Sequence, residues 1–107
     1  MKKYLMNTSI VPNDGLYEMK TISEEEARTW VRKSEIPVSA VGHPGTAEVM
    51  GILLGVEVTA NRMYVIFEVG DEALVYKLNE RLPEGKVLTV DELKELHYRW
   101  KILRRVK

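Results

Sequence analysis

The stretch Val41-Gly42-His43-Pro44-Gly45-Thr46 is the part of the chain that decides our interpretation of the fold. Residues 36–41 are mostly apolar and predict a short buried strand before it, and the apolar run from Ala47 to Leu54 predicts a helix after it. Pro44 suits the first turn of a helix, because proline has no N–H group to leave unpaired there. Gly55 is typical of a helix end. The stretch therefore predicts a strand, a tight turn and a helix.

His43 gives this turn a candidate chemistry. The free N–H groups at the start of a helix attract anions, and phosphate is the most common of these. A histidine beside such a phosphate can donate a proton to the departing oxygen, since imidazole exchanges protons near neutral pH. The simpler alternative is a turn histidine whose ring only hydrogen-bonds the backbone. A Gly-x-x-Gly sequence before a helix is often no more than a turn.

Composition narrows the classes of protein that the chain can belong to. Its 107 residues suit a single domain spanning residues 1–107, and 16 basic residues balance 16 acidic ones. General DNA binding usually needs a surplus of basic residues, so we expect no DNA partner, although a small anion in a local basic pocket remains open. The chain has no cysteine and only two histidines, far apart, so we expect no metal site and no cofactor. No apolar run is long enough to span a bilayer, so we expect a cytoplasmic protein without membrane contact.

The first third of the chain alternates strand and helix signals. Lys3 to Met6 predicts a strand, the turn Pro12 to Gly15 follows, and Leu16 to Ile22 alternates as a second strand would. Ser23 and Glu26 form a capping box that starts a helix ending near residue 33. We expect Ala27, Trp30 and Val31 to face the core.

The second half predicts more strand than helix. Residues 56–58 begin a strand, and Met63 to Val69 gives the strongest strand signal of the chain. A reversal at 70–72 suggests a hairpin with Ala73 to Leu78. A second capping box predicts a short helix from residue 89 to about residue 97. Tyr98 to Val106 alternates as an edge strand protected by Lys and Arg. Together these elements predict an α+β fold, a central mixed β-sheet of about five strands flanked by helices.

Several polar residues are candidates for chemistry, each with a simpler explanation. Asn7 ends the first strand and suits a turn, and Arg62 precedes the strongest strand, where most arginines are only solvated. Arg81 and Glu84 lie three residues apart in a loop that contains Pro83 and Gly85, and by default they form a weak surface ion pair. Together with His43 these residues supply the parts for cleavage of a phosphodiester without a metal.

The chemistry would be an attack by an RNA 2′-hydroxyl group on its own phosphate. The protein must then hold the two groups in line, neutralise the charge that builds up on the phosphate, and protonate the departing oxygen. Arginine suits phosphate oxygens, and a glutamate beside the histidine or arginine would orient it. Sequence alone does not show that these residues meet in space.

The order of the short motifs resembles that of a known family. The motifs are Tyr4-Leu5-Met6-Asn7, Ala40-Val41-Gly42-His43 with Thr46, Leu54-Gly55-Val56, Asn61-Arg62, and Arg81-Leu82-Pro83-Glu84-Gly85. Over nearly the whole chain they resemble the viral anti-CRISPR ring nucleases, which act against type III systems. The region from Thr8 to Gly15 departs from the family pattern.

The resemblance implies an activity and an assembly. It implies a homodimer that binds cyclic tetra-adenylate across its twofold axis. It implies metal-independent cleavage of this ring to linear di-adenylates ending in a 2′,3′-cyclic phosphate, which removes the signal of the host defence. By this resemblance the chain would be a cyclic oligoadenylate phosphodiesterase in the cytoplasm of the host cell.

The resemblance also implies roles for individual residues. His43 matches the general acid, and Arg81 and Glu84 match the arginine and glutamate that complete the catalytic site. Arg62 matches an arginine at the ligand, and Asn7 matches an asparagine near the pocket. The turn residues Gly42, Gly45 and Thr46 are the remaining candidates for substrate binding.

Two other classes of function stay open. A binding module would hold the cyclic nucleotide intact, as a sponge, or would bind nucleic acid as a viral regulator. A structural or protein-interaction domain would have polar residues that only solvate its loops. Neutral net charge argues against DNA binding, and the presence of His43 with Arg81 and Glu84 argues against a pure sponge.

Overall fold

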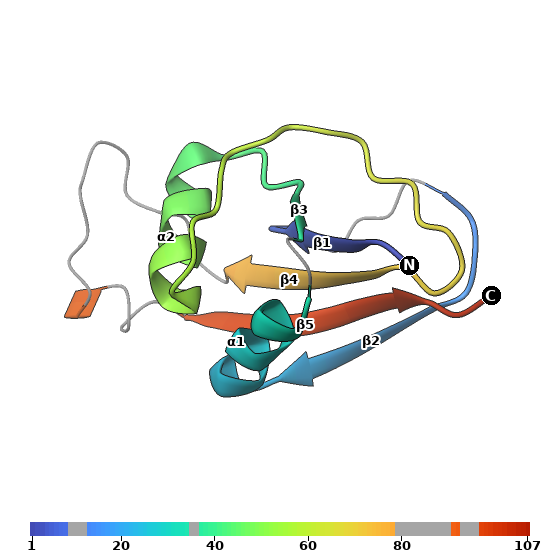
Figure 1. Cartoon of the computed structure of the whole chain (residues 1–107), viewed down its shortest axis with the longest axis horizontal. Coiled ribbons are helices and arrows are strands. Elements are labelled where there is room, and N and C mark those ends of the chain that lie inside the picture. Colours follow the sequence, from blue (N-terminus) through green and yellow to red (C-terminus); the bar gives the residue numbers. More distant parts are fainter. Residues whose placement is uncertain (9–12, 35–36, 79–90, 93–96) are drawn as a thin grey trace.

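One mixed β-sheet with two helices organises the part of the chain that the computed structural model describes, which is residues 1–8, 13–34, 37–78, 91–92 and 97–107 (Figure 1). In chain order the elements are β1 (Lys3–Met6), β2 (Tyr17–Ile22), α1 (Glu24–Lys33), β3 (Val38–Ser39), α2 (Pro44–Leu54), β4 (Glu72–Leu78) and β5 (Tyr98–Arg105). The α+β fold predicted from the sequence, with a mixed sheet of about five strands, is confirmed.

The sheet has the strand order β2-β5-β4-β1-β3. β1 runs parallel to both β3 and β4, whereas β5 runs antiparallel to β4 and β2. The carboxyl ends of β1 and β4 therefore lie at one end of the sheet, together with the start of β5. Helix α2 lies at this end in Figure 1, and both chain termini lie at the other.

Both helices cover the same face of the sheet. The capping box predicted at the start of α1 is present, because Ser23 Oγ accepts from the Glu26 amide and the Glu26 carboxylate accepts from the Ser23 amide. Gly55 ends α2 with a positive φ of 73°, which favours glycine. Ala27 and Val31 of α1 and most of α2 pack on the inward side chains of the sheet, which include Leu5, Leu74, Tyr76 and Trp100.

The residues of α1 predicted to face the core do so, and most of the apolar residues of α2 face it as well. Ala27, Val31, Ala47, Met50, Leu53 and Leu54 are buried, and Trp30 packs against the same cluster. Their spacing of three and four residues puts them on one side of each helix. The periodicity of these two helices was therefore a sound guide to their packing.

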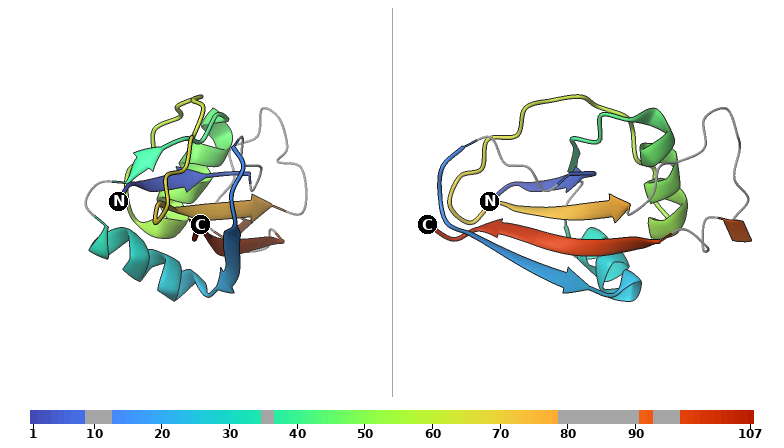
Figure 2. Two further views of the ribbon diagram at one scale, coloured as in Figure 1. Left: turned by 90° about the vertical axis from the view of Figure 1, so that its right-hand side faces the viewer. Right: turned by 180° about the vertical axis from the view of Figure 1, so that it is seen from behind.

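An extended segment, residues 59–69, covers the opposite face of the sheet. Figures 1 and 2 show it running the length of the strands on the β3 side. Val65 and Phe67 are buried against Tyr4, Val75 and neighbouring apolar residues, and the Phe67 ring makes edge contacts with two tyrosines. We call residues 59–69 the strap.

The strap corrects the strongest strand prediction. Residues 63–69 form no strand, and they do not pair with residues 73–78 as a hairpin. Both neighbours of β4 in the sheet are other strands, β1 and β5, so no edge of β4 is left for the strap. The alternation in the sequence instead reflects burial of Val65 and Phe67 on a sheet face, with Tyr64 and Ile66 outward.

Other predicted boundaries also change. The strand predicted at residues 56–58 is absent there. Of the strand expected over 36–41, the described residues 37–41 form a strand only at Val38–Ser39. β5 is an inner strand and not an edge strand, since β2 and β4 flank it. Its Lys and Arg residues project from the sheet faces and do not protect an edge. The third helix, expected from residue 89 to 97, falls mostly outside the described residues.

Candidate functional site

His43 caps the N-terminus of α2. Its Nδ1 accepts a hydrogen bond from the Thr46 amide at 3.2 Å and lies 3.3 Å from Thr46 Oγ1. Thr46 is buried, whereas the His43 side chain is exposed. Because Nδ1 acts as the acceptor, the proton of the neutral ring lies on Nε2, which is the nitrogen left for other contacts.

This cap changes the expected anion site. Pro44 has no N–H, the Thr46 amide is bound to His43, and the Ala47 amide donates to the His43 carbonyl. Of the amides in the first turn, only that of Gly45 makes none of the hydrogen bonds found in the described part of the chain. The helix start therefore offers fewer free amides to an anion than the sequence suggested. The reason is that the His43 ring hydrogen-bonds the backbone, which is the simpler of the two roles that the sequence allowed.

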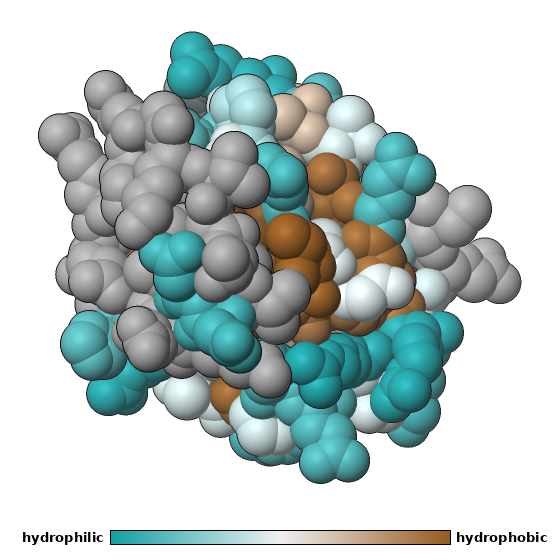
Figure 3. All heavy atoms as spheres, turned by 90° about the vertical axis from the view of Figure 1, so that its left-hand side faces the viewer, coloured by the Kyte–Doolittle hydropathy of each residue, from teal (hydrophilic) through white to brown (hydrophobic). Residues whose placement is uncertain are grey.

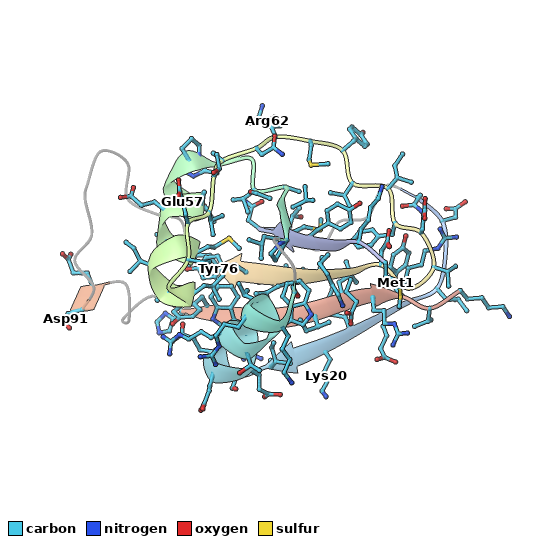
Figure 4. The ribbon with its side chains drawn as sticks, viewed as in Figure 1. Met1, Lys20, Glu57, Arg62, Tyr76 and Asp91 are labelled. Carbon is cyan, nitrogen blue, oxygen red and sulfur yellow. The ribbon has the colours of Figure 1, made fainter. Side chains whose placement is uncertain are left out.

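Arg62 lies against the same turn. A Cβ atom built on Gly42 would lie 3.5 Å from Arg62 Nε and 3.7 Å from its Cβ and Cγ. The arginine side chain therefore passes directly over the backbone that precedes His43. Figure 4 labels Arg62 on the strap, at the outer side of the molecule. Two residues from distant parts of the sequence, one cationic and one a histidine, are thus brought to one turn.

Hydrogen bonds of Asn61 fix this approach. The Asn61 amide donates to the Val41 carbonyl at 2.7 Å, and its side chain donates to the Ser39 carbonyl at 2.7 Å. Ser39 Oγ in turn donates to the Thr59 carbonyl. The strap is therefore bonded to the connection between β3 and α2 on both sides of Ala60, immediately before Arg62.

Asn7 lies near this connection. Leu5 pairs with Ser39, and the Ala40 amide donates to the Leu5 carbonyl at 2.8 Å. Continuation of this parallel register places Asn7 beside Val41. Asn7 is half-buried, and none of the hydrogen bonds among the described residues joins it to His43 or Arg62.

The structure brings together part of the predicted site. Gly42, His43, Gly45, Thr46 and Arg62 lie at one turn, and Asn7 lies on the adjacent strand end. Arg81 and Glu84 fall outside the described residues, so their predicted approach to His43 stays a prediction. Ser39 and Asn61 were not chosen as site residues from the sequence. For Asn61 the sequence held one signal of a special role: the pair Asn61-Arg62 interrupts an apolar pattern.

The described residues contain no group of three or more His, Cys, Asp or Glu side chains arranged to hold a metal ion. The same part of the chain has no helix with the length and apolar character needed to cross a membrane.

Comparisons with known proteins give the chain its relatives. It is 41% identical over 109 residues to the protein ORF117 of Acidianus two-tailed virus, covering 97% of this chain and 93% of that protein. It is 33% identical over 100 residues to protein 26 of a Sulfolobus islandicus filamentous virus, covering 89% and 84%. These names state no activity.

The fold is also found in a solved structure. B116 of Sulfolobus turreted icosahedral virus superimposes with a TM-score of 0.85 over 98% of this chain and 100% of B116, at 24% sequence identity. At this identity the match shows a common fold. The model of the STIV B116-like family matches residues 3–100. The chain therefore belongs to the STIV B116-like family, with relatives in viruses of archaea.

Proposed function

We propose that the protein is a metal-independent ring nuclease that cleaves cyclic tetra-adenylate to linear di-adenylates ending in 2′,3′-cyclic phosphate. The observation that carries the proposal is the placement of Arg62 over Gly42, next to His43 at the start of α2. A guanidinium for the phosphate charge and an imidazole for the departing oxygen are two of the groups that this chemistry needs. The resemblance of the short motifs to those of the viral ring nucleases supports the same activity.

The cap of α2 sets a condition on the proposed acid. An imidazole that donates a proton strongly must carry protons on both nitrogens, and a protonated Nδ1 repels the Thr46 amide that it now accepts from. We propose that a bound phosphate takes over this amide, so that His43 becomes free to bind a second proton. In this scheme the bound substrate brings about the protonation of the histidine that acts on it.

A homodimer fits the shape of the proposed substrate. A fourfold ring contains a twofold axis, so two copies of the chain would present identical His43 and Arg62 residues to opposite phosphates. Ile52 of α2 and Val56, which follows the cap residue Gly55, are exposed apolar residues. Figure 3 shows apolar side chains gathered near the middle of this end of the molecule. These side chains are candidates for the contact with a second copy.

Thermal unfolding with and without cyclic tetra-adenylate tests ligand binding. A ligand that binds only the folded state raises its stability by about 2.7 kcal/mol at 100 times the dissociation constant. A structural or protein-interaction domain would show no shift. Chromatography of the incubated ring then separates an enzyme, which yields di-adenylates, from a sponge, which returns the ring intact. EDTA should leave the rate unchanged, and loss of activity with EDTA would contradict the metal-free scheme.

One observation favours a second candidate, a nucleic-acid-binding regulator. Lys77 lies directly opposite Arg99 on neighbouring strands, and Lys101 follows on the same sheet face. None of the three takes part in an ion pair found among the described residues. Three phosphate contacts predict that the logarithm of the binding constant for a single strand falls with a slope of about −2 against the logarithm of salt concentration. A titration of an oligonucleotide at several salt concentrations would measure it.

A further inference from the structure

The strap is held at both ends by asparagine side chains. Asn61 bonds its first residues to the connection between β3 and α2. Near its other end, Asn13 Nδ2 donates to the Phe67 carbonyl at 2.9 Å, and the Phe67 amide donates to Asn13 Oδ1 at 3.2 Å. Arg105 donates to the same carbonyl at 2.6 Å. The residues between these two clamps are therefore fixed on the sheet without belonging to it.

Tyr64 is the exposed aromatic residue between the clamps. Its relative exposure is 83%, whereas its neighbour Val65 is 4% exposed. The Tyr64 ring makes none of the ring contacts, and its hydroxyl none of the hydrogen bonds, found within the described ranges. A large aromatic side chain held outward by a clamped backbone loses little further freedom when a flat ligand stacks on it.

The position of Tyr64 relative to Arg62 suggests what that ligand is. Alternate residues of an extended segment lie on the same side, so Tyr64 follows Arg62 on the outward side about 7 Å along the chain. An arginine that binds a phosphate and, beside it, a bare aromatic ring are the two groups with which proteins bind a nucleotide without pairing its base.

We infer that Tyr64 is a stacking platform for an adenine base of the cyclic tetra-adenylate whose phosphate Arg62 contacts. The inference rests on the proposed function and adds a binding residue to it. Arg62 holds the backbone of the ring, and Tyr64 holds the attached base in a fixed orientation. Stacking favours purines over pyrimidines, because the larger purine ring covers more of the tyrosine.

Binding of the intact ring tests the inference. His43→Asn is the background, since asparagine also caps a helix but cannot act as the acid, so the ring survives the titration. In this background Tyr64→Ala should weaken calorimetric binding of cyclic tetra-adenylate about 10-fold. Tyr64→Phe keeps the ring face and should bind within about twofold of the parent. Ile66→Ala is the matched control, because Ile66 is the next outward residue of the strap, at 65% exposure.

Each outcome decides a different question. If the His43→Asn protein binds the ring and the added Tyr64→Ala substitution leaves that affinity unchanged, the inference is wrong and the proposed function stands. If the parent shows no binding, the proposed function is wrong and the inference falls with it. If Tyr64→Ala and Ile66→Ala weaken binding equally and both shift the sedimentation coefficient, Tyr64 contacts another protein chain and not a base. Weaker binding of a cyclic tetra-uridylate by the parent, with this preference lost in Tyr64→Ala, would support stacking.

Discussion

His43 combines a structural role with the proposed catalytic one. Its Nδ1 caps α2 through the Thr46 amide, which leaves Nε2 for other contacts. The ring orientation is therefore set by the helix start, and the nitrogen that would face a substrate is determined by the fold. Sequence reasoning placed the histidine at this turn and weighed both roles. It did not foresee that capping uses one of the amides meant for the phosphate.

Two substitutions of His43 separate these roles. His43→Ala removes the cap and the imidazole, so we expect a loss of about 1 kcal/mol in the free energy of unfolding and of about 4 °C in melting temperature. His43→Asn keeps a capping oxygen and should melt near the parent temperature. Thermal unfolding followed by circular dichroism measures the difference.

The same pair tests the chemistry. Both variants should bind the ring and cleave it at least about 100-fold more slowly in single-turnover assays, because each lacks the proposed general acid. Cleavage by His43→Asn at the parental rate would exclude His43 as the general acid, whatever the stability of the variant.

At the scale of elements, the charges that lie opposite each other on the helix-covered face of the sheet are of opposite sign. Lys3 is ion-paired with Glu72, and Arg104 lies opposite both Glu72 and Glu18. The pair of Lys77 and Arg99 on the other face is the exception, since like charges directly opposite each other destabilise a sheet. A function that needs positive charge at Lys77 and Arg99 would explain why the protein has this unfavourable pair.

Lys77→Glu should therefore stabilise the fold. An opposite charge facing Arg99 replaces a repulsion by an attraction, and we expect a gain of about 0.5 kcal/mol at low salt. Added salt should reduce the gain by screening. Urea unfolding at two salt concentrations measures it. Lys20→Glu is the control, because Lys20 faces the uncharged Ile102 across β2 and β5. Equal stability changes in both variants would show that the cross-strand pair is not the cause.

Helix α1 is tied to β5 by one carboxylate. Glu24 accepts hydrogen bonds from the Tyr98 hydroxyl at 2.6 Å and from the Trp100 indole at 3.3 Å. Burial, and then the bond to Glu24, raise the pKa of Tyr98 to about 12. The folded state therefore favours the protonated phenol. This contribution to stability is complete below about pH 10, the tyrosine pKa of an unfolded chain, and is lost as the pH rises through about 12.

Tyr98→Phe tests this contact. We expect the variant to lose about 1 kcal/mol of unfolding free energy at pH 7, a value reduced for the partial exposure of the pair. The difference from the parent should shrink above pH 10, where the parent loses its own contribution. Denaturant unfolding at pH 7, 9 and 11 measures both effects. Tyr64→Phe should leave the curve unchanged, and a constant deficit of Tyr98→Phe at every pH would contradict the assignment.

The strap shows where local sequence stops predicting elements. Its alternation is that of a strand, and Val65 and Phe67 are buried as the pattern implies. Whether the strap joins the sheet depends on segments distant in the sequence. β1 and β5 occupy the two sides of β4, so the strap cannot pair with that strand. The buried Asp71 carboxylate, which accepts from the amides of Lys2 and Glu68, then directs the chain from the strap into β4. The helices were predictable because caps and apolar spacing are local signals.

At the scale of the whole molecule, zero net charge must be reconciled with the polyanionic substrate that we propose. The position of Arg62 resolves this, because Arg62 lies 19 residues after His43 in the sequence but contacts the turn that precedes it. A second copy would double that charge around one axis. The sequence motifs identified His43 and Arg62 as candidates. The contact of Arg62 with the turn before His43 depends on the path of the strap, which no local sequence pattern specifies.

Stoichiometry provides the test at this scale. If two chains share one ring, calorimetry of His43→Asn with cyclic tetra-adenylate should give one ring per two chains, because each half of the ring contacts one copy of Arg62. Sedimentation should show a dimer at the same concentrations. A single ring per chain would place the whole binding site in one copy and contradict the shared axis.

Ile52→Lys provides the control for assembly, since a charge at the exposed apolar side of α2 should favour monomers and reduce ring affinity and cleavage together. If that variant became monomeric but still cleaved the ring at the parental rate, the catalytic site would not need its partner.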